Sequence, residues 1–539
     1  MSFSCRRTGH GWSSASSTSP IRFSTVPSSA APGSMANSTA DAVTGVIDMH
    51  LTKSRYLAGL QCLRRLWLGV NQPPEWAEPA PGSSQDIGAE IGLKAHLLFP
   101  GGVLVEEAPW QHEEAVARTR ALMADPSVPA IFEAAFEQDG IRIRVDVLER
   151  LPRGRWGLRE VKSSGSVKDH YLDDVAVQMH VLAVAELQLS SVELLFVNKD
   201  YVRGEHGIAW AAFFSREDIK GRAAARLDGI ADRIAGQMAC LRQRKEPMIE
   251  PGAHCSSPYA CDYWDHCTAG KPKDWVALLP RLTEKALGKL TEAGFEAISA
   301  IPADFPLTNQ HAVIRDVLVS GRPFVAPDLA RLLQGFAAPA LYLDFEAFAP
   351  TIPLYAGTRP FQTIPFQWSL HRLDADGTLS HLEFLADGAA DPRRDFAESL
   401  IRAVGTEPTP IVVYSSYEQT QLRTLAARFE DLKEPIDAII ARLRDLLPVV
   451  RGAVYHPGFN FSYSIKTVGP ALCPDFSYGD LDQVADGLAA SNAFYRLAAG
   501  GLDSATAIGL RQALLTYCER DTLAMVEVHR ALVRMAKEP

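Results

Sequence analysis

The stretch Ala340-Leu341-Tyr342-Leu343-Asp344-Phe345-Glu346 joins an apolar run directly to two carboxylates. An apolar run of this length predicts a buried strand. Because side chains alternate along a strand, Asp344 and Glu346 point to the same face. Two neighbouring carboxylates can coordinate Mg²⁺ or Mn²⁺ through oxygen. The alternative is an ordinary polar strand end, so this prediction depends on acidic residues elsewhere in the chain.

Further acidic residues lie downstream of this strand. Tyr517-Cys-Glu-Arg-Asp521 falls in a segment predicted to be helical, and residues four apart share one helix face. The carboxylate of Asp521 can therefore complete a pocket for a pair of metal ions, an arrangement that cuts phosphodiesters. After a predicted strand, Ile411-Val-Val-Tyr-Ser-Ser-Tyr-Glu418 supplies another acid, and Asp445 is the alternative for that position.

These residues resemble the motifs of the DnaQ-like, or DEDD, exonuclease superfamily. Asp344-x-Glu346 is similar to its first motif, and Tyr517-x-x-x-Asp521 is similar to its third motif in the tyrosine form. The second motif normally ends in Asp, whereas this chain has Glu418. The resemblance implies a 3′-end exonuclease in which Tyr517 positions the attacking water. The implied ligands of its two metal ions are Asp344, Glu346, Glu418 and Asp521.

A second candidate site lies nearer the start of the chain. Residues 130–149 alternate apolar and polar side chains around Asp139-Gly140, which predicts a β-hairpin. The next strand carries Glu160 and Lys162 on one face, and Asp146 can meet them from the hairpin. The two carboxylates can hold Mg²⁺ or Mn²⁺, while Lys162 can stabilise a hydroxide or the developing phosphate charge. Taken alone, Glu-x-Lys is a common pattern, and a solvated polar face is then the better interpretation.

The order of Asp146, then Glu160-Val161-Lys162, then a helix carrying Gln178 resembles the PD-(D/E)XK nuclease core of the RecB-like type. The resemblance implies that Asp and Glu hold the metal, that Lys acts on the attacking water and that Gln178 supports the site. It also implies a metal-binding His on an earlier helix, for which His96 is the candidate. A structural histidine is the alternative. The family often has a Tyr four residues after the Gln, where this chain has Leu182.

The cysteines form a third pattern. The chain has eight, too few for a secreted disulfide scaffold of this length. Cys255, Cys261 and Cys267 lie close together, and Cys62 is an earlier candidate partner; four thiolates suit zinc or an iron–sulfur cluster. One early and three late cysteines around a RecB-like core resemble the iron–sulfur staple of CRISPR-associated RecB-like nucleases and AddB-type helicase–nucleases. That resemblance implies a [4Fe–4S] cluster, with zinc or unligated thiols as the alternatives.

Composition and length set the remaining expectations. The chain has 539 residues, 47% of them hydrophobic and 22% charged, which is typical of a multidomain globular protein. No apolar stretch approaches the roughly 20 residues that span a bilayer, so a cytoplasmic protein without a membrane partner is expected. The net charge of −10 is neutral evidence, because bound cations and a local groove can neutralise phosphates. Residues 215–244 predict one long amphipathic helix.

Both halves together resemble a bacterial family of uncharacterised proteins that joins a RecB-like nuclease to a DnaQ-like domain. The phrases that carry this resemblance are Leu51-Thr-Lys-Ser-Arg-Tyr56, Pro365-Phe-Gln-Trp-Ser-Leu-His371, Tyr463-Ser-Ile-Lys466 and Tyr517-Cys-Glu-Arg-Asp-Thr-Leu-Ala-Met525. The expected fold class is multidomain α/β, with a restriction-endonuclease-like core and a C-terminal ribonuclease-H-like domain. The expected parts are a disordered Ser-rich extension (1–48, with a transit peptide as the alternative), the RecB-like nuclease (49–270), a helical linker with a helix-hairpin-helix-like turn (271–337) and the DnaQ-like domain (338–539).

The function implied by this resemblance is a metal-dependent nuclease with two carboxylate sites. DNA is favoured over RNA as the substrate, and DNA repair or defence against foreign DNA is the expected setting. The contrasting hypothesis is a nucleic-acid-binding scaffold that contains an iron–sulfur cluster and has one or both nuclease centres inactive. Glu418, which stands where the family has Asp, is the residue that most favours this contrasting hypothesis.

Overall fold

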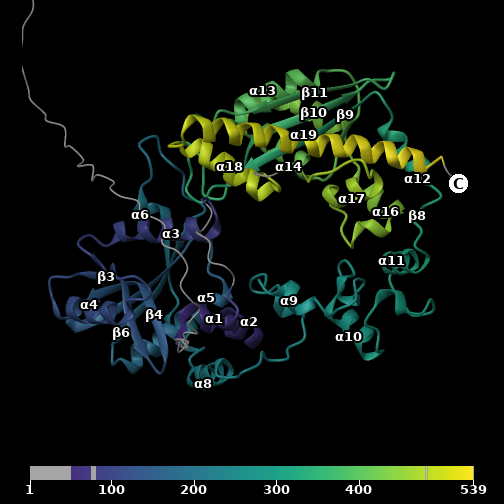
Figure 1. Cartoon of the computed structure of the whole chain (residues 1–539). Helices are drawn as coiled ribbons and strands as arrows, with labels where there is room; N and C mark the ends of the chain where they lie inside the picture. Colours follow the sequence, from purple (N-terminus) through teal and green to yellow (C-terminus); the bar gives the residue numbers. More distant parts are fainter. Residues whose placement is uncertain (1–49, 74–80, 480, 482–483, 538–539) are drawn as a thin grey trace, which may run out of the picture. The chain divides into compact units, whose positions relative to one another are not determined.

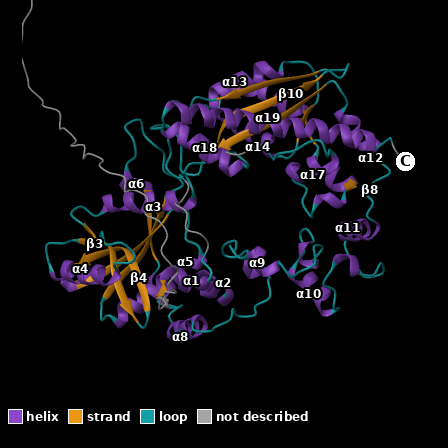
Figure 2. Cartoon of the chain, viewed as in Figure 1, coloured by secondary structure: helices purple, strands orange, loops and turns teal. Residues whose placement is uncertain are grey.

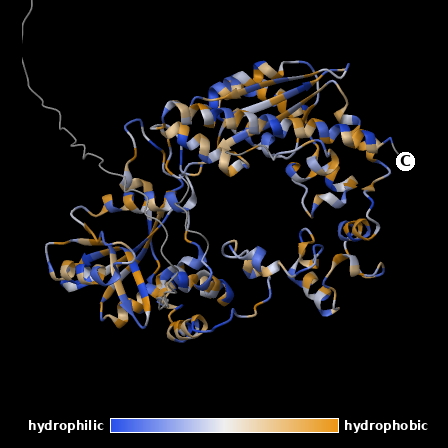
Figure 3. Ribbon diagram, in the orientation of Figure 1, coloured by the Kyte–Doolittle hydropathy of each residue, from blue (hydrophilic) through white to orange (hydrophobic). Residues whose placement is uncertain are grey.

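The computed structural model describes residues 50–73, 81–479, 481 and 484–537. The predicted Ser-rich extension lies outside the described residues. The described chain contains two large mixed β-sheets with many helices, so it is a multidomain α/β protein (Figures 1 and 2). Hydrophobic and hydrophilic residues are interleaved along its helices (Figure 3). None of the helices within the described ranges combines the length and the apolar character needed to cross a membrane.

A seven-stranded sheet organises the first half of the chain. Its strands follow the order β2-β3-β4-β5-β6-β7, and the short β1 pairs with β4 in parallel. The pairs β3–β4, β4–β5 and β6–β7 are antiparallel, whereas β5–β6 is parallel. The strands are β1 (Leu51–Thr52), β2 (Val103–Leu104), β3 (Ala130–Gln138), β4 (Ile141–Leu151), β5 (Arg155–Lys162), β6 (Leu189–Val197) and β7 (Phe214–Asp218).

Helices pack on this sheet through buried apolar side chains such as Ile91, Leu122 and Leu172. The helices of this half are α1 (Lys53–Gln61), α2 (Leu63–Asn71), α3 (Ser84–Ala95), α4 (His112–Ala124), α5 (Asp169–Val184), α6 (Trp210–Phe213), α7 (Lys220–Ala224), α8 (Ile230–Leu241) and α9 (Trp264–Thr268). Helices α1 and α2 are separate because Cys62 between them has extended backbone angles, φ −164° and ψ 124°.

The hairpin predicted around Asp139-Gly140 is confirmed. Gln138 pairs with Ile141, so the turn has two residues, and both have positive φ (53° and 78°). Two-residue hairpin turns of this type favour a small polar residue followed by glycine. The turn therefore fixes the register that carries Asp146 along β4.

The long helix predicted for residues 215–244 is wrong. Residues 214–218 form β7 instead, because they alternate in burial and complete the sheet beside β6. The remainder is divided into α7 and α8, with Gly229 in the left-handed region (φ 70°) before α8 begins. Strand pairing and one glycine therefore override a helical periodicity.

A five-stranded sheet organises the C-terminal half. Its order is β11-β10-β9-β12-β13; β9 to β11 are antiparallel, and β12 and β13 run parallel to β9. The strands are β9 (Ala340–Phe348), β10 (Ile364–Leu373), β11 (Leu379–Leu385), β12 (Ile411–Val413) and β13 (Leu443–Asp445). The helices are α13 (Arg393–Val404), α14 (Tyr417–Arg428), α15 (Lys433–Arg442), α16 (Leu447–Ala453), α17 (Ile465–Leu472), α18 (Gly487–Ala499) and α19 (Ser504–Met535).

The segment predicted as a linker is helical and contributes to the core of this half. It contains α10 (Glu284–Glu292), α11 (Asn309–Ser320), β8 (Phe324–Val325) and α12 (Leu329–Leu332). Leu290 and Ile314 belong to the same apolar cluster as Tyr342 of β9 and Leu532 of α19. In addition, β8 pairs with β14 (Val454–Tyr455). This segment is therefore packed structure rather than a free tether.

Candidate metal centres

The C-terminal centre forms where the central strand β9 meets the long helix α19. Strand β9 carries Asp344 and Glu346, and α19 carries Asp521. One ligand oxygen from each of these three residues lies within 4.8 Å of the other two. No other group of three His, Cys, Asp or Glu in the described residues is as close. The structure thus brings together the strand and helix carboxylates that the sequence spacing selects.

The fourth predicted acid, Glu418, approaches from the first turn of α14. Its side chain is buried, and its Oε2 accepts a hydrogen bond of 3.4 Å from the Ser415 hydroxyl. Burial raises the pKa of Glu418. Hydrogen bonds from its own backbone and from Ser415, and then one with Asp344, oppose this rise, while the charge of Asp445 adds to it. Asp445 has a different role, because its Oδ1 accepts a hydrogen bond from the Leu447 amide at 3.0 Å, at the start of α16. Glu418 is therefore the acid that joins Asp344.

Burial and mutual repulsion raise the pKa values of the acids in this centre. Burial raises the pKa of Glu346 to about 8 and that of Glu418 to about 7. Desolvation, followed by the charges of Asp521 and Glu418, holds the pKa of Asp344 well above its usual range. Oδ1 of Asp521 is buried without a hydrogen-bond partner in the described structure. Crowded carboxylates with a spare oxygen suit a hard divalent ion such as Mg²⁺ or Mn²⁺.

Tyr517 lies one helical turn before Asp521, as its spacing predicts, and its hydroxyl accepts a hydrogen bond from Lys466 Nζ at 2.8 Å. Lys466 also donates to the Ala485 carbonyl at 2.8 Å, so the lysine is held in place. Its charge lowers the pKa of Glu346 and of Asp521, opposing the larger effect of burial. The sequence phrase Tyr463-Ser-Ile-Lys466 contained this residue, but its local pattern gave no sign of this role.

Cys518 lies directly beneath the acids. Its sulfur is 3.8 Å from Oδ2 of Asp344, and its side chain is fully buried. Burial and then the charge of Asp344 raise the pKa of this thiol well above its usual range. The thiol therefore stays protonated beside the carboxylates.

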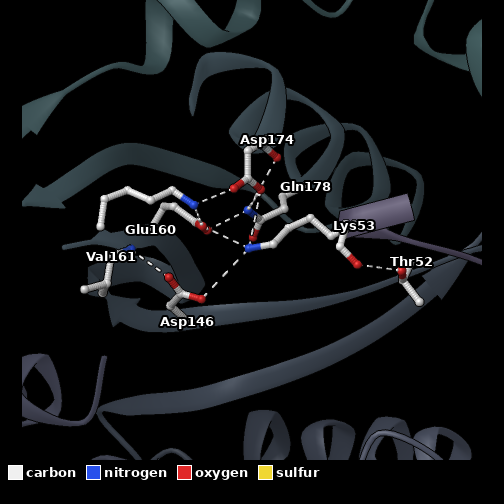
Figure 4. A network of polar contacts seen from close by, with 9 residues as sticks. Thr52, Lys53, Asp146, Glu160, Val161, Asp174 and Gln178 are labelled. Carbon is white, nitrogen blue, oxygen red and sulfur yellow. Dashed lines mark hydrogen bonds and ion pairs between the residues drawn. The ribbon is translucent and has the colours of Figure 1, made fainter. Parts of the chain in front are cut away.

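The N-terminal centre brings together Asp146, Glu160 and Gln178 from β4, β5 and α5 (Figure 4). Lys162 of β5 joins them through Glu160. Oε1 of Glu160 accepts a hydrogen bond from Lys162 Nζ at 2.7 Å, and Oε2 accepts one from Gln178 Nε2 at 2.6 Å. Oδ2 of Asp146 accepts a hydrogen bond from the Val161 amide at 2.7 Å. Adjacent strands and the following helix therefore converge as predicted.

Two further residues of this centre, Lys53 and Asp174, were not predicted from the sequence. Lys53, at the start of α1, places its Nζ 2.9 Å from Glu160, 3.4 Å from Asp174 and 4.0 Å from Asp146 (Figure 4). Asp174 lies four residues before Gln178 on α5 and accepts a hydrogen bond from Lys162 at 2.6 Å. Because residues four apart share one helix face, the position of Gln178 could have predicted that Asp174 also points to the site. Lys53 follows Leu51-Thr52 in the sequence and contacts Glu160, which lies 107 positions later, so no local pattern indicated its role.

Lysines compensate the charge of this centre. Burial, and next the charge of Glu160, raises the pKa of Asp146 to about 7. Burial would also raise the pKa of Asp174, but Lys53 and Lys162 outweigh it and hold that pKa low. Conversely, burial would lower the pKa of Lys53, yet Asp174 and Glu160 outweigh it and raise the pKa. The donor set of Asp146 and Glu160 suits a divalent ion, but the Lys53 ammonium lies among these carboxylates.

His96 does not join this centre. Its ring stacks on Phe132 with centroids 3.8 Å apart and an interplanar angle of 5°. Phe132 pairs with Val147, the neighbour of Asp146. Because side chains alternate along β4, the Phe132 ring lies on the face of the sheet opposite Asp146. The structure therefore separates His96 from the metal ligands with which it was predicted to act.

The four predicted cysteines lie near one another. Cys62 separates α1 from α2, and Gln61 Nε2 donates to the carbonyls of His254 and Tyr259 at 2.7 and 2.8 Å, which ties the later loop to this junction. Burial raises the pKa of Cys261 and of Cys267, and the other thiols of the group raise both further.

The spacing of these thiols is wider than one zinc ion requires. Zn–S bonds of about 2.3 Å in a tetrahedron hold the sulfurs about 3.8 Å apart. Within the described chain, no three of the cysteine sulfurs lie within 4.8 Å of one another. Four thiolate donors suit either an iron–sulfur cluster or zinc.

Comparison with known proteins adds one match. A family model described as a domain of unknown function (DUF2779) matches residues 341–464. The matched region contains Asp344, Glu346 and Glu418 but ends before Tyr517 and Asp521. No curated protein matches the chain.

Proposed function

We propose that this chain is a metal-dependent nuclease that hydrolyses phosphodiester bonds of nucleic acid, with DNA favoured over RNA. The observation that carries this proposal is the convergence of Asp344, Glu346, Glu418 and Asp521, whose pKa values are all raised. The strand order β11-β10-β9-β12-β13, antiparallel and then parallel, supports a ribonuclease-H-like, DnaQ-type domain. DNA repair or defence is the proposed setting.

In this proposal Asp344, Glu346 and Asp521 hold the ions, and Glu418 completes the ligands beside Asp344. Divalent ions bound there would polarise the phosphoryl group and activate the attacking water. The Tyr517 hydroxyl, fixed by Lys466, orients that water next to Asp521. This arrangement corresponds to the tyrosine form of the DEDD exonucleases, which act at 3′ ends.

We also propose that the N-terminal centre is of the RecB-like PD-(D/E)XK type. Its ligands would be Asp146 and Glu160, with Lys162 acting on the attacking water and Gln178 supporting Glu160. One observation favours the competing role of a binding scaffold for this half: the Lys53 ammonium already bonds Glu160 at 2.9 Å. Cleavage at this centre requires Lys53 to give way to the metal ion.

The proposed nuclease is tested with purified protein, Mg²⁺ or Mn²⁺, and end-labelled single- and double-stranded DNA and RNA. Asp344→Asn with Glu346→Gln should remove stepwise 3′-end shortening, and Glu160→Gln should remove any remaining cleavage. Asp395→Asn, an exposed acid on α13, is the matched control. If the wild-type protein degrades none of the four substrates, the enzyme proposal fails and the scaffold remains.

For the cysteines we propose a [4Fe–4S] cluster held by Cys62, Cys255, Cys261 and Cys267. Protein purified without oxygen should be brown and contain iron rather than zinc. Cys261→Ser should bleach it and lower stability by about 2–4 kcal/mol, as loss of a cross-link does. Cys473→Ser, at a buried thiol of the C-terminal half, should leave colour and iron content unchanged. Colourless wild-type protein that contains zinc would show that the cysteines hold zinc instead.

A further inference from the structure

A cavity of about 400 Å³ lies beside the C-terminal acids. Asp344 and Glu418 line it, so it is continuous with the proposed catalytic centre. Its lining also contains two cations and two aromatic rings, from Arg281, Arg451, Tyr414 and Tyr463. Its volume lies in the usual range of small-molecule sites, which is roughly 300–1,000 Å³. The same cavity is therefore lined by carboxylates and also by arginines and tyrosines.

The two arginines keep guanidinium groups that are not committed to a carboxylate. Among the described residues, neither Arg281 nor Arg451 lies within ion-pair distance of a carboxylate, although acids line the same cavity. Burial raises the pKa of Asp445, and the charge of Arg451 opposes this rise. Arg451 lies over the ring of Tyr463 at 5.7 Å, and Arg281 is exposed. A guanidinium that is left unpaired presents planar donors that match phosphate.

The packed segment before β9 positions one of these cations. Arg281 has a φ of 58° in the turn before α10, and the carbonyl of its neighbour Pro280 accepts a hydrogen bond from His311 Nε2 at 2.9 Å. The preceding residue on α11, Gln310, donates to the Tyr463 hydroxyl at 3.3 Å. The segment is thus joined to the cavity wall through Gln310, and the backbone next to Arg281 is tied to α11 through Pro280.

The aromatic groups add a second kind of contact. Tyr414 and Tyr463 line the cavity, and the Tyr414 hydroxyl is buried without a hydrogen-bond partner in the described structure. Nucleic-acid-binding grooves combine cations along the backbone with aromatic rings that contact the bases. A spare buried hydroxyl beside them can bond to a sugar or base.

We propose that this cavity binds the terminal nucleotide of a single nucleic-acid strand, with Arg281 and Arg451 on its phosphate groups and Tyr414 and Tyr463 against its sugar and base. This inference rests on the proposed nuclease function, because it places the strand end next to Asp344 and Glu418. Contacts of this kind are independent of base identity, so the site accepts any base. The segment before β9 is then part of the substrate site as well as of the core.

The test uses a fluorescent single-stranded oligothymidylate, with Ca²⁺ in place of Mg²⁺ for binding and with Mn²⁺ for hydrolysis. The variants are Arg281→Gln, Arg451→Gln and the double variant. Glutamine removes the positive charge but keeps a long polar side chain. The double variant should weaken binding by tenfold or more and raise KM similarly, with kcat within about threefold. The dependence of log affinity on log salt should become shallower by about 0.7 for each phosphate group that the variant no longer neutralises.

The control is Arg402→Gln, an exposed arginine on α13, which should bind and cleave as the wild type does. Circular dichroism melting of each variant establishes that it is folded. If the folded double variant binds the oligonucleotide like the wild type, or loses kcat at unchanged affinity, the nucleotide site is overturned while the nuclease function stands. If the wild type binds through both arginines without cleaving, the site stands and the nuclease function falls.

Discussion

In the N-terminal centre, Lys53 and Lys162 place two ammonium groups among the carboxylates of Asp146, Glu160 and Asp174. In the C-terminal centre, four carboxylates share one nearby lysine, Lys466, which bonds to the hydroxyl of Tyr517 instead. The first centre therefore balances its acids with ammonium groups, and the second leaves its acids uncompensated, which raises their pKa values. Excess charge, rather than the number of acids, decides how strongly a site attracts a divalent ion.

This difference separates the affinities expected at the two centres. A divalent ion entering the C-terminal centre relieves repulsion among acids whose pKa values are raised. An ion entering the N-terminal centre must first displace an ammonium that is hydrogen-bonded to Glu160 at 2.9 Å. We expect the C-terminal centre to fill at lower metal concentration.

The largest effect is expected from Asp344→Asn. Removal of a charge shared by the ligand group should lower the rate of 3′-end hydrolysis by about 10³-fold or more, since residues that act as a unit lose function together. Glu160→Gln should leave this reaction within about threefold, because it belongs to the other centre. Initial rates on 3′-labelled single strands measure both. Equal losses in the two variants would show that the centres do not act separately.

A smaller effect is expected on the stability of the metal-free protein. The folded-state pKa values of Glu346 (about 8) and Glu418 (about 7) lie above the ordinary value of 4.5. Such groups stabilise the fold fully below pH 4.5, and this contribution is lost as pH rises through 7 and 8. Denaturant melts in EDTA should therefore show a decline of about 2 kcal/mol between pH 6.5 and 8, on the scale of about 1.4 kcal/mol per pKa unit.

Two companion measurements sharpen this pH experiment. Glu346→Gln should flatten the decline, and saturating Mg²⁺ should restore stability at pH 8, because each removes the cost of a crowded carboxylate. The matched change Asp395→Asn, at an exposed acid, should leave the slope as it is. A metal-free protein whose stability rises steadily from pH 5 to 8 would contradict the crowding of these acids.

The smallest effect is expected from Lys53→Met. Without the ammonium, the N-terminal carboxylates should bind Mn²⁺ about tenfold more tightly, which corresponds to about 1.4 kcal/mol. Electron paramagnetic resonance titrations in an Asp344→Asn, Asp521→Asn background isolate this centre. Lys245→Met, at an exposed lysine, is the control. Unchanged Mn²⁺ affinity in the folded variant would show that Lys53 does not compete with the ion.

The sequence predicted much of both centres because their key residues follow local rules. Alternation placed Glu160 beside Lys162 and Asp344 beside Glu346, and helical spacing placed Tyr517 beside Asp521. The residues that were missed depend on contacts far along the chain: Lys53 reaches Glu160 across 107 positions, and Lys466 reaches Tyr517 across 51. The helix predicted for residues 215–244 failed for a similar reason, because β7 forms only where β6 is available to pair.

Helix α1 connects a residue of the N-terminal acidic centre, Lys53, to one of the predicted cysteine ligands, Cys62. It carries Lys53 at its first position and is followed at once by Cys62, and its nine residues span about 13 Å at 1.5 Å per residue. A helix of this length moves as a stiff rod. A displacement of Cys62 would therefore be transmitted along α1 to Lys53, and through its ammonium to the carboxylates around Glu160.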